Sequence, residues 1–296
     1  MKTAGRHRDE ILALLRGIPA LAGVAPENIT ISPLGGLSHT NLKLETPVGT
    51  FVVQIPVPDP HAPDRALAIE ATRRASRLGI GAALVHDEPG TGVLVTRWVA
   101  GAETLSPERL RGNTRVLGEV AGLLRRWHRS GEGLGQAIDH FDAIDRLRAT
   151  LTAPVGSARL VEALSRAKTE RGTQASFAPI HGDPDLENLL STPGGCVLID
   201  WEYAGMGDPA WDLGYLALAT DMSPIEEAAL LASYADPGIT IRRLRLNRLI
   251  AAALSALWFA VRMHREASPD LSDWMQPRLR QAEELAATLY PDAGSE

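Results

Sequence analysis

The sequence predicts an α+β protein with two lobes: a small, mainly antiparallel β lobe that contains one key helix, and a large helical lobe. Two observations carry this prediction. Between residues 29 and 96, short apolar runs bounded by turn residues alternate with one helical pattern, whereas after residue 101 the patterns are helical. The single β-rich interruption of the helical part lies at residues 179–203.

The N-terminal region predicts three strands, then a helix, then two further strands. Pro47-Val-Gly49 between the second and third strands is typical of a hairpin turn. The helix is predicted from apolar residues at helical spacing, and Gly79 ends it. The predicted strands are residues 29–33, 40–46, 50–55, 83–87 and 92–96; the predicted helix is 64–78, and a short helix precedes them at 9–17.

A short linker at residues 97–101 is the predicted hinge between an N-terminal lobe, residues 1–96, and a C-terminal lobe, residues 102–296. Pro193-Gly-Gly195 predicts a turn between two short strands of the β-rich interruption. We expect the last residues, 292–296, to be frayed. The predicted helices of the C-terminal lobe are 106–130, 140–150, 156–171, 208–221, 224–234, 239–265 and 271–289.

Composition excludes several classes of function. The net charge is −6 and Lys and Arg form no extended stripe, which argues against nucleic acid as a partner. The single cysteine, Cys196, rules out an intrachain disulfide and fits a reducing compartment. The longest apolar segment, residues 249–261, is shorter than the roughly 20 residues of a membrane span. We therefore expect a cytoplasmic protein; its oligomeric state is not predicted.

The chemistry is carried by His181-Gly-Asp-Pro-Asp-Leu-Glu-Asn188, followed by Leu198-Ile-Asp200-Trp-Glu202. Phosphoryl transfer needs a carboxylate that orients or deprotonates the attacking hydroxyl, and an amide and a second carboxylate that hold magnesium ions. Asp and Asn also satisfy backbone groups in ordinary turns. The joint pattern of loop, strand and second acid is more specific than such turns, and it favours the catalytic interpretation.

These residues resemble the aminoglycoside phosphotransferase and choline kinase superfamily, whose members have a protein-kinase-like fold. The stretch 198–213 is most similar to the bacterial choline/ethanolamine kinase branch. Upstream, residues 34–41 are similar to the nucleotide loop of the family, 92–101 to the strand that enters its hinge, and 115–128 to a helix ending in L-L-R-R-x-H. The resemblance covers most of residues 29–215.

The resemblance implies a phosphotransferase that uses ATP and Mg²⁺ and acts on the hydroxyl of a small, cationic alcohol such as choline or ethanolamine. It implies that Asp183 acts as the base-like residue and that Asn188 and Asp200 are the metal ligands. The residues that it implies for nucleotide binding are Gly35, Gly36, Ser38, Gln54, Glu70, Thr96 and Trp98.

Gln54 departs from the family pattern. Relatives carry Lys or Arg at this place, which binds the α- and β-phosphates and pairs with a helix glutamate, here Glu70. Glutamine donates a hydrogen bond but brings no charge. Three interpretations stay open: another cation such as Lys43 replaces the charge, phosphate binding is weak, or Gln54 faces solvent. The second interpretation motivates an alternative function, a catalytically weak binding module with a kinase fold.

A cationic substrate calls for an aromatic wall and a carboxylate. In the family branch, the helix after D-P-x-x-D-L commonly carries an acid and a tryptophan, whereas this chain has no acid there before Asp221. Choline is therefore not fixed as the substrate, and thiamine or an aminoglycoside are the alternatives. The candidate substrate residues are Glu202, Tyr203, Trp211, Tyr215 and Trp258.

Overall fold

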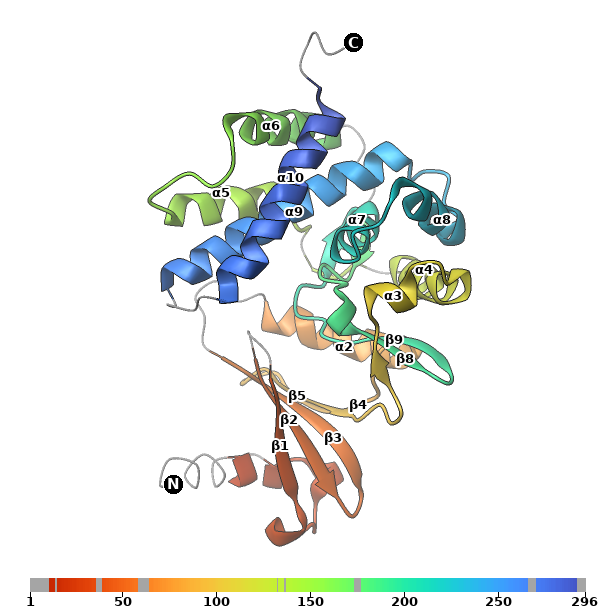
Figure 1. Cartoon of the computed structure of the whole chain (residues 1–296). Coiled ribbons are helices and arrows are strands. Elements are labelled where there is room, and N and C mark those ends of the chain that lie inside the picture. The colour runs from red at the N-terminus through yellow and green to blue at the C-terminus, as the bar shows by residue number, and fades with distance from the viewer. Residues whose placement is uncertain are drawn as a thin grey trace. The chain divides into compact units, whose positions relative to one another are not determined.

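The computed structural model describes residues 11–13, 15–35, 39–57, 64–131, 133–135, 137–172, 177–265 and 270–291. The chain divides into two compact units (Figure 1). The first unit comprises the residues up to 102 together with 197–203, and the second comprises 103–196 and the residues from 204 onward. The predicted region 102–296 thus differs from the second unit in one segment, because residues 197–203 return to the first.

The first unit is built on a five-stranded antiparallel sheet with strand order β1-β2-β3-β5-β4. All five strands fall where the sequence predicts them, within a few residues at each end. Of the helix predicted at 9–17, residues 9, 10 and 14 lie outside the described residues. The strands are β1 (Thr30–Gly35), β2 (His39–Thr46), β3 (Gly49–Pro56), β4 (Leu84–Glu88) and β5 (Val93–Arg97).

The two faces of this sheet differ because side chains alternate along each strand. Leu42, Leu44, Phe51 and Val53 are buried on one face, in a core that includes apolar residues of the N-terminal segment. The other face carries a more polar row in which Asn41 of β2 lies opposite Gln54 of β3. The sheet therefore separates an apolar core from a face that carries polar groups.

Helix α2 (Arg65–Leu78) follows β3 in the first unit. Its start is fixed by Asp64, whose carboxylate accepts hydrogen bonds from the backbone N–H groups of Ala66 and Leu67. Its end is fixed by Gly79, which has a φ of +64° and so adopts the left-handed conformation that glycine tolerates. The predicted helix 64–78 is confirmed.

The second unit is mainly helical, and one predicted helix is corrected there. The sequence predicted a continuous helix at 106–130, but the structure breaks it at Arg111–Asn113, where Gly112 has a φ of +67° and Asn113 caps the next helix. The helices are α3 (Pro107–Leu110), α4 (Thr114–His128), α5 (His140–Thr150), α6 (Ala158–Gly172), α7 (Ala210–Ala219), α8 (Pro224–Tyr234), α9 (Ile241–Arg265) and α10 (Asp270–Leu289).

Short strands lie between these helices. β8 (Leu189–Thr192) and β9 (Gly195–Leu198) flank the predicted turn at 193–195. The sequence analysis did not predict β6 (Glu103–Thr104), β7 (Ala178–Ile180) or β10 (Gly205–Gly207) as strands. β6 pairs with β8, and β7 pairs with β10, so each gains its hydrogen bonds from a segment far away in the sequence. Strands of two or three residues leave almost no periodic signal.

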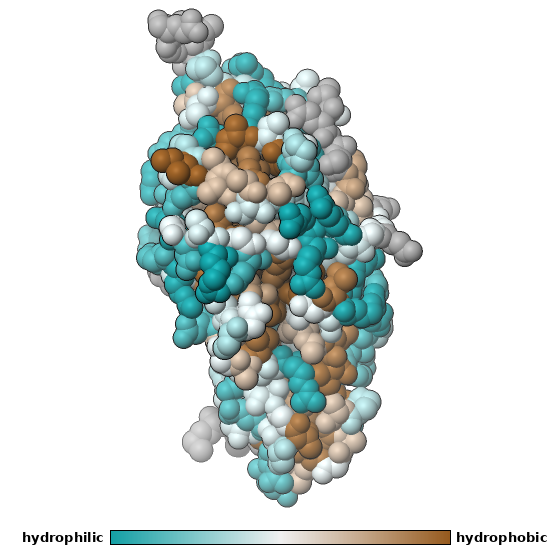
Figure 2. All heavy atoms as spheres, turned by 90° about the vertical axis from the view of Figure 1, so that its right-hand side faces the viewer, coloured by the Kyte–Doolittle hydropathy of each residue, from teal (hydrophilic) through white to brown (hydrophobic). Residues whose placement is uncertain are grey.

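Helix α9 is the centre of the second unit and packs against α7 and α10 (Figure 1). Gly214 of α7 permits this approach, because a β-carbon there would lie 2.6 Å from the backbone nitrogen of Arg248. Among the described helices, α9 alone is long and apolar enough to cross a membrane, but 72% of its most apolar window is buried inside the structure. Hydrophilic and hydrophobic residues are interspersed over the face drawn in Figure 2. The length and apolarity of α9 are those of a core helix.

Candidate active site

The predicted catalytic loop lies in the second unit, between β7 and β8. The side-chain amide of Asn188 donates hydrogen bonds to the backbone carbonyl of Asp183, at 3.0 Å, and to its carboxylate oxygen Oδ2, at 3.3 Å. The imidazole Nδ1 of His181 accepts a hydrogen bond from the backbone N–H of Asp183. His181 thus braces the loop backbone, and Asn188 holds the carboxylate of Asp183.

A buried carboxylate of α7 fastens this loop. Asp212 accepts hydrogen bonds from the backbone N–H groups of His181, at 2.7 Å, and Gly182, at 3.0 Å. Its Oδ2 also lies 2.8 Å from Nε2 of His128, whose Nδ1 is 2.8 Å from the hydroxyl of Tyr234. Asp212, His128 and Tyr234 are all buried. Their hydrogen bonds form a continuous network that runs from Tyr234 of α8, through His128 of α4 and Asp212 of α7, to the loop.

Trp211 holds the same loop from the other side and is not available to a ligand. Its indole Nε1 donates a hydrogen bond to the carbonyl of Gly182, and its ring stacks on His140 with 3.4 Å between centroids. Only 1% of Trp211 is exposed, so the prediction that it forms part of a substrate wall is wrong. Burial, and then the charge of Arg171, hold the pKa of His140 well below its usual range.

Tyr215 lies one turn further along α7, and its hydroxyl forms a hydrogen bond with the carboxylate of Asp183. Burial raises the pKa of Tyr215 well above its usual value, and the negative charges of Asp183 and Asp185 add to this rise. Tyr215 therefore stays protonated and acts as a hydrogen-bond donor. The Asp183 carboxylate is thus held by two neutral donors, Asn188 and Tyr215.

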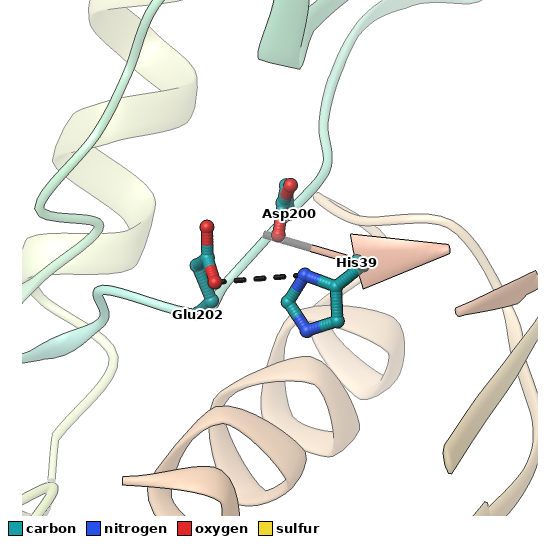
Figure 3. Close-up of side chains that lie close together, drawn as sticks. All are labelled: His39, Asp200 and Glu202. Carbon is teal, nitrogen blue, oxygen red and sulfur yellow. Dashed lines mark ion pairs between the residues drawn. The ribbon is translucent and has the colours of Figure 1, made fainter. Parts of the chain in front are cut away.

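The first unit brings together Asp200, Glu202 and His39. Figure 3 shows the two acids on one loop segment and His39 facing them from the start of β2. Nδ1 of His39 lies 3.5 Å from Oε2 of Glu202, and one ligand atom from each of the three residues lies within 4.8 Å of the others. Burial lowers the pKa of His39; the charge of Asp200 opposes this shift and that of Arg65 adds to it.

Asp200 has an unusual backbone. Its φ is +61°, in the left-handed region that few residues other than glycine adopt, and among the described non-glycine residues it shares this only with Asp221 and Ala235. The neighbouring residue Leu198 is tied by its backbone N–H to the carbonyl of Ile80. A strained backbone of this kind costs about 1 kcal/mol or more and is concentrated at functional sites.

Gln54 does not face away from these residues. It lines a pocket of the first unit, here called the Gln54 pocket, together with the three residues of Figure 3, strand residues of β3 and β5, and one side of α2. This removes the interpretation in which Gln54 simply points to solvent. The lining residues are His39, Gln54, Pro56, Arg65, Ala68, Ile69, Thr72, Gly92, Leu94, Asp200, Trp201 and Glu202.

Two residues expected to act with Gln54 have other partners and are not among the lining residues. The carboxylate of Glu70 pairs with Arg77 at 3.3 Å and with Arg73 at 3.8 Å, both on its own helix. The ammonium of Lys43 pairs with Glu45 at 2.8 Å and lies 4.9 Å from the ring centroid of Trp98. This geometry supports neither Glu70 as an ion-pair partner at position 54 nor Lys43 as a substitute cation.

The other residues predicted for nucleotide binding are spread along the first unit. Gly35 ends β1 with a φ of +82° and has no atom within 4 Å of the place where a β-carbon would lie. Thr96 lies opposite Val52, on the same sheet face as Gln54, and Trp98 donates its backbone N–H to Thr50. Gly36 and Ser38 lie outside the described residues.

The remaining substrate candidates, Tyr203 and Trp258, are both half-buried. Trp258 belongs to an aromatic group on α9 and α10 that the sequence analysis did not identify as a group. Its ring contacts Phe259, with 5.1 Å between centroids, and Phe259 contacts Trp274, at 5.8 Å. Trp274 is 53% exposed, so this group offers aromatic surface at the face of the second unit.

The donor atoms present fit magnesium. In the first unit, Asp200 and Glu202 offer carboxylate oxygens. In the second unit, Asn188 carries an amide Oδ1, while its Nδ2 is turned to Asp183. Mg²⁺ prefers such hard oxygen ligands and usually binds one or two carboxylates together with phosphate oxygens and waters. His39 adds a nitrogen near the two acids, which Mg²⁺ does not require.

Sequence reasoning missed the supports of the catalytic loop. The sequence predicted Trp211 only as a substrate contact and indicated no role for Asp212 or His128. The signal of Trp211 and Asp212 was the spacing D-P-A-W-D-L, which places both residues in the first turn of a helix next to a catalytic loop. The partner of each lies 29 or more residues away, so only the folded chain brings them together.

Comparison with known proteins gives consistent results. The profile of the phosphotransferase enzyme family matches residues 30–246. The protein LicA of Haemophilus influenzae is 25% identical over 281 residues, which are 88% of this chain and 81% of LicA. A thiamine kinase of Shigella boydii is 31% identical over 213 residues, which are 70% of this chain and 69% of the kinase.

Solved structures agree with the fold predicted from the sequence. A choline/ethanolamine kinase family protein from Mesorhizobium loti superposes with a TM-score of 0.78 and 28% identity, covering 94% of each chain. The choline kinase LicA of Streptococcus pneumoniae gives a TM-score of 0.80 at 20% identity, covering 95% of this chain and 99% of that one. The predicted protein-kinase-like α+β fold is confirmed.

Proposed function

Because this chain belongs to the phosphotransferase enzyme family and is a small-molecule kinase, we propose that it transfers the γ-phosphoryl group of ATP to the hydroxyl of a small, cationic alcohol. The observation that carries the proposal is the environment of Asp183. Its carboxylate is held by Asn188 and Tyr215, on a loop that Asp212 fastens through two backbone hydrogen bonds.

Asp183 accepts the hydrogen bond of the substrate hydroxyl and orients its oxygen toward the γ-phosphorus. A bond forms between this oxygen and the phosphorus, the bond to the β–γ bridging oxygen breaks, and ADP leaves. The hydroxyl proton passes to Asp183 as the new bond forms. Such transfer depends on positioning more than on a strong base, which fits a carboxylate held by two neutral donors.

Asp200 and Asn188 are the residues that we propose to hold Mg²⁺. When bound, magnesium neutralises charge on the phosphate oxygens. The left-handed backbone of Asp200 fixes the direction in which its carboxylate projects from the loop. For the nucleotide itself, the proposed contacts are with Gly35, Gly36, Ser38, Gln54, Thr96 and Trp98, which is the region similar to the nucleotide loop and hinge strand of the family.

The substrate class rests on two arguments. Choline and thiamine are alcohols with a fixed positive charge. The proteins similar to this chain include a choline kinase and a thiamine kinase. Aromatic faces attract such cations, by about 0.5–2 kcal/mol for each good contact. Tyr203, Tyr215, Trp258 and the carboxylate of Glu202 are the proposed substrate contacts. Thiamine is the second candidate because of the 31% identity to a thiamine kinase. A cytoplasmic location stays a prediction.

The experiment is an ADP-release assay with Mg-ATP and a panel of choline, ethanolamine, thiamine and an aminoglycoside. We add 3,3-dimethylbutanol, which has the shape of choline without its charge. A cationic alcohol should be phosphorylated and the neutral analogue should not. Asp183→Asn is the control, and it should lower the rate by about 10²-fold or more while ATP still binds. Equal rates with choline and its neutral analogue would reject the cationic class.

A further inference from the structure

The lining of the Gln54 pocket contains neither member of the ion pair that the family pattern implies. Position 54 carries a neutral amide. The side of α2 that lines the pocket consists of Arg65, Ala68, Ile69 and Thr72, which follow the helical spacing of three and four residues. None of these is an acid, so no carboxylate of α2 within the lining stands ready to pair with a cation at position 54.

Among the described residues that line the pocket, Arg65 is the one lysine or arginine. It is exposed, and no ion pair or hydrogen bond joins its guanidinium to another of the described residues. The other basic residues nearby differ in this respect, because Arg73 pairs with Asp87 through two hydrogen bonds and Lys43 pairs with Glu45. Within the described part of the chain, no side chain therefore neutralises the guanidinium of Arg65 through an ion pair.

The stem of Arg65 lies close to Gly92 of the β4–β5 turn. A β-carbon at Gly92 would lie 2.9 Å from Cδ of Arg65 and 3.1 Å from Cγ of Pro56. Glycine at this place, with a φ of +78°, lets the arginine stem lie close over the turn. Arg65 is the first residue of α2, so its guanidinium extends from the start of this helix at the edge of the pocket.

We propose that Arg65 binds the phosphates of the nucleotide and replaces, from the first turn of α2, the cation that the family pattern places at position 54. This proposal rests on the proposed function. A guanidinium suits the task because it donates two parallel hydrogen bonds to phosphate and keeps its charge at any working pH. The position of Glu70 outside the lining fits this proposal, since a carboxylate on the pocket side of α2 would compete with phosphate for Arg65.

Isothermal titration calorimetry of Mg-ATP and of adenosine tests this proposal without a turnover assay. Arg65→Gln should weaken Mg-ATP binding about tenfold or more, the scale of a charge-assisted hydrogen bond, and leave adenosine binding unchanged. The matched control is Arg77→Gln, on the same helix but outside the pocket, and it should change neither affinity by more than about twofold. The double variant Arg65→Gln/Gln54→Lys should recover Mg-ATP affinity, because the charge returns at the family position.

The proposal would be overturned if Arg65→Gln bound Mg-ATP with an affinity within twofold of wild type. It would also be overturned if the affinities for Mg-ATP and adenosine fell equally, because that result indicates a structural role of Arg65. A double variant as weak as Arg65→Gln would show that the two positions do not serve the same phosphates. These outcomes are separate from the failure of the proposed function, in which the wild-type protein itself binds no Mg-ATP or phosphorylates no alcohol of the panel.

Discussion

At the scale of single residues, the candidate site depends on which partner each polar group has. Gln54, Glu70 and Lys43 show this, because their sequence positions suggested one shared phosphate site. In the structure only Gln54 lines the pocket, while Glu70 and Lys43 are paired elsewhere. The position of a residue in a strand fixes the sheet face from which its side chain projects. The ion-pair partner of a long, flexible side chain depends instead on the charges around it.

Tyr215 gives a prediction at this scale. Tyr215→Phe removes the hydroxyl that binds the carboxylate of Asp183 while keeping the ring. We expect kcat to fall about tenfold, the scale of one hydrogen bond to a charged group, with little change in Mg-ATP affinity. Steady-state kinetics and calorimetry measure the two effects. An unchanged kcat would mean that Asn188 alone is enough to orient Asp183.

At the scale of elements, α7 is the element that fixes the catalytic loop. Its first turn presents Trp211 and Asp212 to the loop, one to a carbonyl and the other to two backbone N–H groups. Gly214 on the same helix allows α9 to pack closely against it. The first turn of α7 therefore attaches the loop to the core of the second unit.

The variant Asp212→Ala tests this attachment. It leaves two backbone donors and the imidazole of His128 buried without their acceptor. We expect the free energy of unfolding to fall by about 3 kcal/mol or more in urea denaturation, since breaking a buried charged network carries that cost. Asp142→Ala is the control, because its pair with Arg146 is exposed and should contribute less than about 1 kcal/mol. Similar losses in both variants would contradict the role of Asp212.

His140 on α5 predicts how stability depends on pH. Its pKa in the folded protein lies well below its usual value of 6.5, because burial disfavours the charged form. Below about pH 6.5 the unfolded chain therefore binds a proton that the folded chain does not, so the free energy of unfolding falls as pH decreases. Denaturation between pH 7.5 and 5 should show this decline, and His140→Asn should reduce it. The exposed His264→Asn is the control; an equal reduction there would contradict the assignment.

At the scale of the whole molecule, the residues proposed for the reaction are divided between the two units. Asp183 and Asn188 belong to the second unit, and Asp200, Glu202 and Gln54 belong to the first. The chain leaves the second unit within β9 and returns to it after Tyr203, so the segment with Asp200 is an excursion of seven residues, 197–203. The hinge at residues 97–101 stays a prediction. Residues 197–203 come after this hinge in the sequence and yet belong to the first unit.

Asp200→Asn gives a prediction at this scale. Asparagine tolerates the left-handed backbone at this position, whereas alanine would add strain. We expect phosphoryl transfer to fall by about 10²-fold or more, since a proposed metal ligand loses its charge. The free energy of unfolding should stay within about 0.5 kcal/mol of wild type, because no buried ion pair is broken. Turnover within tenfold of wild type, measured with an established substrate, would remove Asp200 from the mechanism.

The sequence by itself determined the class of fold and predicted the catalytic loop. Strands with alternating burial, a capped α2 and an apolar α9 leave periodic signals that depend on neighbours a few residues away. The residues of 181–188 and 198–202 are also near neighbours in the chain, so their spacing indicated phosphoryl transfer directly. The break at Arg111–Asn113 was missed, because helical residues on both sides outweighed Gly112.

Only the tertiary structure decided which groups meet across long separations. The hydrogen bonds of His128 join it to Asp212, 84 residues away, and to Tyr234, 106 residues away. No local sequence pattern encodes contacts over such separations. The same holds for Trp211, which an aromatic composition suggests as a ligand wall but which the fold buries against His140. The physical reason is that burial and ion pairing depend on the packing of whole elements, whereas sequence periodicity reports only the face from which a side chain projects.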